Sequence, residues 1–290
     1  MKRLAPLMVT ALLATLLQFS TAAPSHATEG WSGTPARNAA CRAPLTAAQK
    51  QRLIELSNPS TLKSFAAAAP RVDEIAAILV GARDNRGIFA IFYQRILDQA
   101  VPAVAAGDFD DPVWVERVSL NFVREYLANL HGHLTGGRVT YSWQRYYALA
   151  ADCQRTIGRV AGAALLAHLV IDFPKAIADA RSTAANQADF FSIGNLLIEA
   201  TNALTGDISA AYGQDLTDLF NLYSLGQGIN DLAQANVITP VFFQSVRASA
   251  WVDGLKLTSP WTAWSAQMAM DSKWAAGSST MNLMEMLGLV

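Results

Sequence analysis

Among the four histidines of the chain, His168 has the clearest chemical surroundings. His168 and Asp172 are four residues apart, so on a helix their side chains share one face, with Cβ atoms about 5–6 Å apart. This spacing suits two ligands of one metal ion, or a carboxylate that orients an imidazole. Pro174 follows closely and would free the carbonyl of Val170 within a helix. Because the segment is otherwise apolar, Asp172 needs a polar partner.

A second histidine pair, His131 and His133, follows the predicted helix over residues 114–130. If this pair folds onto His168 and Asp172, the four side chains provide the ligands for one divalent metal ion such as zinc. Such an ion would activate a water molecule for hydrolysis. Glu125, on the helix that leads to the pair, is a candidate base or further ligand.

Each of these assignments has a structural alternative. His131 and His133 also suit a solvated helix end, where positive charge is favourable. Asp172 also suits a cap, or an ion pair with Lys175 or Arg181. Glu125 also suits an exposed surface position. The i, i+4 pair is a weak motif by itself, and Pro174 and the second histidine pair add to it.

Aromatic residues are concentrated in the middle of the chain and near its C-terminal end. Tyr126, Trp143 and Asn195 are candidates for binding a small-molecule, lipid-like or sugar-like ligand. Their helical spacing also fits packing in a hydrophobic core, in which Asn195 would be a buried hydrogen-bonding group.

Other classes of site lack support in the sequence. There is no G-x-S-x-G motif, no glycine-rich phosphate loop and no C-x-x-C motif. The 22 basic and 23 acidic residues give a net charge of −1, which provides no field to hold a nucleic-acid backbone. We therefore expect no nucleic-acid partner.

Apolar residues recur at helical spacing through most of the chain, and no segment shows sustained strand alternation. We expect an all-α fold: one compact multi-helix domain over residues 45–290, built around a central buried Ala/Leu-rich helix over residues 157–177. That helix is interrupted and short for a membrane span. Near the C-terminus, the pattern predicts a helix from Ser259-Pro260 and a last helical turn over residues 280–287.

The first residues have the features of a secretory signal peptide. Lys2 and Arg3 precede the apolar residues 4–19, and Ser25-His26-Ala27 fits a cleavage site, so residues 1–27 are the predicted signal and residues 28–44 an extended lead-in. The protein would be secreted, or located in the periplasm or cell envelope, without a transmembrane span after cleavage. In such a compartment Cys41 and Cys153 would form a disulfide; two buried free thiols are the alternative.

The order of several motifs resembles a bacterial domain-of-unknown-function family that is common in actinobacteria. These motifs are Gly87-Ile88-Phe89-Ala90-x-Phe92-Tyr93, Gly107-x-Phe109-x-Asp111-Pro112-x-Trp114, Phe122-Val123-x-x-Tyr126-Leu127, Ala167-His168-x-x-x-Asp172-x-Pro174 and Ile193-x-Asn195. The resemblance covers roughly residues 65–270 and implies an all-helical domain without assigning an activity. Phe173 replaces the leucine expected before the proline.

His168 and Asp172 are also similar to the H-x-x-x-D metal motif of zinc-dependent phospholipases C and single-strand nucleases. Those enzymes bind three metal ions through many histidines and aspartates, and this chain has too few histidines for that. The sequence therefore predicts at most a single-metal hydrolase. It leaves open a non-catalytic protein that binds an apolar or sugar-like ligand, or an envelope-associated structural protein.

Overall fold

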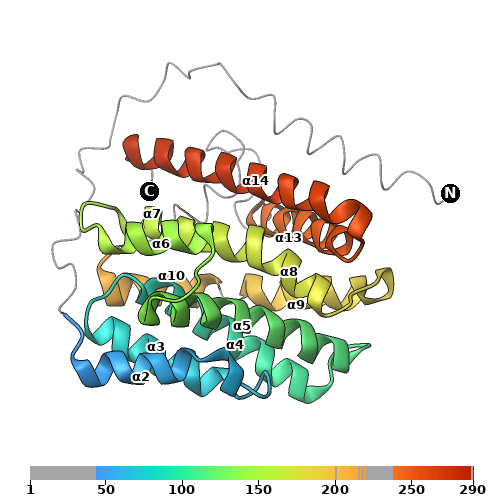
Figure 1. Cartoon of the computed structure of the whole chain (residues 1–290), viewed down its shortest axis with the longest axis horizontal. Coiled ribbons are helices and arrows are strands. Elements are labelled where there is room, and N and C mark those ends of the chain that lie inside the picture. The colour runs from blue at the N-terminus through green and yellow to red at the C-terminus, as the bar shows by residue number, and fades with distance from the viewer. Residues whose placement is uncertain (1–43, 200, 215, 217–218, 220–237, 289) are drawn as a thin grey trace. The chain divides into compact units, whose positions relative to one another are not determined.

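The computed structural model describes residues 44–199, 201–214, 216, 219, 238–288 and 290 (Figure 1). These residues form helices and connecting turns and include no strand, which confirms the predicted all-α fold. They belong to one unit of the chain, residues 35–290. The predicted signal peptide, nearly all of the lead-in and Cys41 lie outside the described residues and stay predictions.

The first helices follow from local sequence signals. Helix α2 (Ala47–Ser57) begins with a capping box, in which the backbone N–H of Gln49 donates to Thr46 Oγ1 at 3.2 Å. Helix α3 (Ala68–Gly81) buries its apolar stripe against α4 (Gly87–Ala106). The hydrophobic surface that these helices bury forms part of the larger of two core clusters.

Helix α5 (Pro112–Thr135) begins where Asp111 accepts a hydrogen bond from the backbone N–H of Trp114 at 2.9 Å. It ends at Gly136, whose φ of 72° is in the left-handed region that favours glycine. The helix is therefore longer than the predicted 114–130, and His131 and His133 lie within its last turns. The prediction that they follow the helix was wrong because Gly132 does not end it.

The predicted central helix is present, as α7 (Ile157–Leu166), the π-helical turn η2 (Ala167–Asp172) and α8 (Phe173–Asp179). The stretch Ile157–Asp179 has the length and apolar composition of a membrane span, but 89% of its most apolar window is buried within the protein. This burial is typical of a core helix. The N-terminal end of this stretch packs on α6 (Tyr141–Ala151), and α8 packs on α5.

The remaining helices lie around this centre. They are η1 (Pro59–Thr61), η3 (Ala184–Asn186), α9 (Gln187–Glu199), α10 (Thr201–Tyr212), α13 (Ile238–Leu257) and α14 (Pro260–Met286). Helix α14 is continuous where the sequence suggested two helical segments. Gly277 lies within this helix and does not interrupt it. A Cβ at this position would lie 2.6 Å from Leu166 Cδ2, so the glycine permits close packing on α7.

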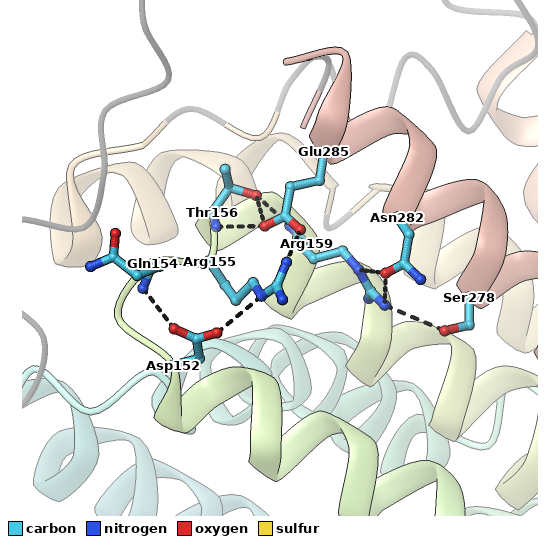
Figure 2. A network of polar contacts seen from close by, with 8 residues as sticks. All are labelled: Asp152, Gln154, Arg155, Thr156, Arg159, Ser278, Asn282 and Glu285. Atoms are coloured by element: carbon cyan, nitrogen blue, oxygen red, sulfur yellow. Dashed lines mark hydrogen bonds and ion pairs between the residues drawn. The ribbon is translucent and has the colours of Figure 1, made fainter.

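Polar contacts fix α14 to the N-terminal end of α7 (Figure 2). The buried Arg159 donates from Nε and Nη2 to Asn282 Oδ1, at 3.0 and 2.8 Å. Glu285 accepts from the backbone N–H of Thr156 at 3.0 Å and from Arg155 Nη1 at 2.9 Å. These contacts hold the C-terminal helix over the central helix and thereby enclose it.

Buried side chains form two clusters. The larger involves α2 to α7 and the C-terminal end of α14, and the smaller joins the start of α5 to α8, α9 and α13. His168 lies where the two meet, since its ring contacts Phe89 and Trp143 of the first cluster and Phe122 of the second.

Candidate functional site

The centre of the candidate site is a buried hydrogen-bonded pair. His168 Nδ1 lies 3.1 Å from Asp172 Oδ2, and both side chains are 0% exposed. Trp143 Nε1 donates to the same carboxylate oxygen at 2.7 Å. A carboxylate in this position favours the tautomer in which His168 Nδ1 carries the proton and Nε2 presents its lone pair. Trp143 and Asp172 together therefore orient the imidazole.

Aromatic rings enclose the imidazole. The ring of Phe122 stacks on that of His168, with centroids 3.6 Å apart and an interplanar angle of 10°. Phe89 and Tyr93 meet the imidazole edge-on, at 5.0 and 5.1 Å. The other face of Phe122 stacks on Phe173 at 4.3 Å. Phe122 thus lies between His168 and Phe173 and connects the imidazole to the second cluster.

Three buried polar atoms at this site have no hydrogen-bond partner among the described residues: His168 Nε2, Asp172 Oδ1 and Tyr126 Oη. Buried polar groups are normally satisfied, and an exception at one place calls for an explanation such as a catalytic role, an ordered water or a ligand. These three atoms come from α5 and η2, which pack together, and Tyr147 Oη on α6 likewise has no hydrogen-bond partner among the described residues. Their concentration marks this part of the core as a candidate site.

Burial changes the protonation of both partners. It lowers the pKa of His168 well below its ordinary value, so the imidazole is neutral at neutral pH. It raises the pKa of Asp172 to about 7, and the hydrogen bond from Trp143 opposes that increase. Asp172 is therefore poised between its two protonation states near neutral pH.

Glu125 is a second carboxyl group with this property. It is partly buried on α5, and burial, followed by the charge of Asp172, raises its pKa to about 7. The nearby Lys175 lowers the pKa of both Glu125 and Asp172. Carboxyl groups whose pKa values are raised to near 7 are a feature of acid–base sites.

The local backbone follows from Pro174. Proline has no N–H, so it cannot continue the helical hydrogen-bond ladder. The chain makes a π-helical turn immediately before it, in which the N–H of Phe173 bonds to the carbonyl of His168. Isolated π-turns occur frequently at functional sites. His168 and Asp172 are both within this turn.

The structure does not bring the predicted four-residue metal site together. His131 Nδ1 lies 3.0 Å from the carbonyl oxygen of Ile54 and 3.3 Å from Ser57 Oγ, against α2. The ring of His133 stacks on that of Tyr147 at 4.0 Å and is exposed. No group of three His, Cys, Asp or Glu side chains in the described part of the chain is arranged to hold a metal ion.

Separate placement of the histidines follows from the helix that carries them. Residues two apart on a helix point in different directions, so His131 and His133 cannot face one ion when both are within α5. The sequence prediction failed because it placed them just past the end of the helix. Of the four predicted ligands, only His168 and Asp172 lie together, as a hydrogen-bonded pair.

The three predicted ligand-binding residues do not share one environment. Tyr126 and Trp143 are buried in the aromatic cluster, with ring centroids 5.7 Å apart. Asn195 is exposed on α9, so the prediction that it is buried was wrong.

Cys153 follows α6 in a turn, and its predicted disulfide to Cys41 stays a prediction.

Sequence reasoning missed two neighbours of His168. Phe122 and Tyr93 stand out only as parts of the motifs that carry the family resemblance, although both contact the imidazole. The role of Trp143 as a hydrogen-bond donor to Asp172 was also missed. The usable signal was the need of Asp172 for a partner, although residues 141–147 offer several donors besides Trp143.

The fold and the site define an all-helical domain with a buried His–Asp pair on a π-helical turn of its central helix. The chain belongs to a family of unknown function, DUF5995, whose model matches residues 66–282. This confirms the resemblance to an uncharacterised domain family. No curated protein and no solved structure matches the chain.

Proposed function

We propose that this protein is a hydrolase of the acid–base type, with His168 as the general base. The observation that carries the proposal is the orientation of His168 by Asp172, which leaves Nε2 without a partner in the described residues. The same division of roles occurs where a carboxylate holds the tautomer of a histidine that accepts a proton from a nucleophile.

In this proposal, water is the nucleophile. His168 Nε2 takes a proton from the water as its oxygen bonds to the electrophilic centre of the substrate. Asp172 stabilises the imidazolium that results, and Trp143 holds Asp172 in place. Glu125, with its pKa near 7, gives a proton to the leaving group and recovers one from His168 through solvent.

Access to the imidazole requires movement of Phe122. The imidazole is fully buried, and the stacked ring of Phe122 covers one of its faces. Rotation of Phe122 out of the stack would connect His168 to the side of α5 that carries Glu125, one helical turn further along. The stacked arrangement is then the resting state of the enzyme.

The experiment is hydrolysis of a panel of chromogenic carboxylic, phosphate and glycosidic esters by the wild-type protein and by His168→Gln. We expect turnover of at least one compound and a loss of about a hundredfold or more in kcat/KM in the variant. Asp172→Asn tests the orienting role, and Asp108→Asn, at an exposed loop position, is the control. Turnover that is absent from the whole panel, or unchanged in His168→Gln, contradicts the proposal.

A further inference from the structure

A second feature of the molecule, apart from His168, is a cavity of about 340 Å³. It lies where α2 begins, where α3 turns into α4 and where α5 ends. Its lining includes Leu45, Lys50, Asp84, Arg86, His133 and Leu134. The volume is within the range of small-molecule sites.

The single acidic side chain among these lining residues is committed to Arg86. Asp84 Oδ1 accepts from the backbone N–H and Nε of Arg86 at 3.0 and 2.9 Å, and Asp84 Oδ2 accepts from Arg86 Nη2 at 2.6 Å. Both side chains are buried. The carboxylate therefore compensates the guanidinium along its Nε–Nη2 edge.

Two cationic donors remain available to the cavity. Arg86 Nη1 makes no hydrogen bond to a described residue, and Asp84 occupies the opposite edge of the guanidinium. The ammonium group of Lys50 is exposed and forms no ion pair with a described residue. Arg86 and Lys50 come from different elements and both line the cavity, an arrangement that suits an anion.

The loop that carries Arg86 is held in place before any ligand binds. Tyr146 Oη donates to the carbonyl of Arg86 at 3.0 Å, and Tyr212 Oη donates to the carbonyl of Asp84 at 2.7 Å. At Gly87 a Cβ would lie 2.3 Å from Tyr212 Oη, so the glycine permits this close approach. A fixed loop lowers the entropy cost of binding.

The apolar part of the lining selects the rest of the ligand. Leu45 and Leu134 lie in the same cavity as the two cations. We propose that this cavity is a binding site for a small organic anion, a carboxylate or a phosphate ester. Its charged group binds Arg86 and Lys50, and its apolar part packs against Leu45 and Leu134.

Titration calorimetry with acetate, octanoate and inorganic phosphate tests this site. Octanoate should bind about tenfold more tightly than acetate, because its chain removes more apolar surface from water. Phosphate, which carries more charge than acetate, tests whether an anionic group without an apolar chain is enough for binding to the cavity. The ring signals of His133 should shift during the octanoate titration, which locates the ligand in this cavity.

Lys50→Glu should weaken octanoate binding by about tenfold or more, because it replaces an attractive charge with a repulsive one. Lys256→Glu is the matched control, since Lys256 is exposed on α13 and does not line the cavity. The absence of binding of all three anions at millimolar concentration would overturn the proposal. Equal weakening by the two substitutions would also overturn it.

Discussion

His168 Nδ1 and Asp172 Oδ2 lie 3.1 Å apart within one π-helical turn, and water reaches neither side chain. A buried pair of this kind is costly unless its charges are compensated or absent. Neutralisation of His168 and partial protonation of Asp172 lower that cost. The resulting protonation states can be measured.

The first prediction concerns the pH dependence of stability. Asp172 titrates near 7 in the folded protein and near 4 in the unfolded chain. As the pH rises between these values, the unfolded chain loses its proton first, so this group lowers the free energy of unfolding. Between pH 5 and pH 8, the free energy of unfolding of the wild type should therefore fall by about 2–3 kcal/mol relative to that of Asp172→Asn. Chemical denaturation of both proteins at the two pH values measures this difference.

Asp108→Asn is the control for this measurement, because Asp108 is exposed. Its free energy of unfolding should follow the wild type across the same range. If wild type and Asp172→Asn differ by the same amount at both pH values, Asp172 does not have the raised pKa.

The second prediction concerns the ring that covers His168. Phe122→Ala should lower the free energy of unfolding by about 3–4 kcal/mol, since it removes a buried ring that stacks on His168 and Phe173. Water then reaches the imidazole, so the pKa of His168 should rise towards its ordinary value. Histidine NMR titration measures this change.

Phe191→Ala is the matched control. Phe191 is partly buried and packs on Phe190, in the smaller cluster. We expect Phe191→Ala to lower the free energy of unfolding without changing the pKa of His168. A pKa that stays low in Phe122→Ala would show that Phe122 does not exclude water from the imidazole.

The third prediction concerns the packing of α13 against α8. A Cβ at Gly254 would lie 2.6 Å from Ile177 Cβ and 2.9 Å from the carbonyl oxygen of Pro174. Gly254→Ala should therefore destabilise the protein by about 1–3 kcal/mol, because one helix must move. Gly81→Ala, with no atom within 4 Å of the new Cβ, should be neutral or slightly stabilising. Thermal unfolding of both variants checks the difference, and equal effects would contradict it.

The fourth prediction concerns the contacts in Figure 2. Asn282→Leu removes the acceptor of two hydrogen bonds from the buried Arg159. The free energy of unfolding should fall by about 2 kcal/mol, because these hydrogen bonds involve a charged donor. Thr280→Ala, on the exposed side of the same helix, should cost less than half as much. Hydrogen exchange should show faster opening of α14 only in Asn282→Leu.

Local signals in the sequence determined the helices and the central pair. The capping residues Thr46 and Asp111 start helices because their side chains bond to nearby backbone N–H groups. His168 and Asp172 contact one another because four residues are about one helical turn, which requires no knowledge of the rest of the fold. The apolar composition of residues 157–177 likewise predicted the central helix, and Pro174 the irregularity within it.

Contacts between distant residues were decided by the tertiary structure alone. Trp143 donates to Asp172, Phe122 covers His168, and His131 lies against Ile54 of α2. None of these three contacts follows from spacing in the sequence. Helical periodicity specifies which face of a helix is buried but not which helix it meets. The partners of a buried polar group depend on how several helices pack at once, so only the assembled core determined the surroundings of His168.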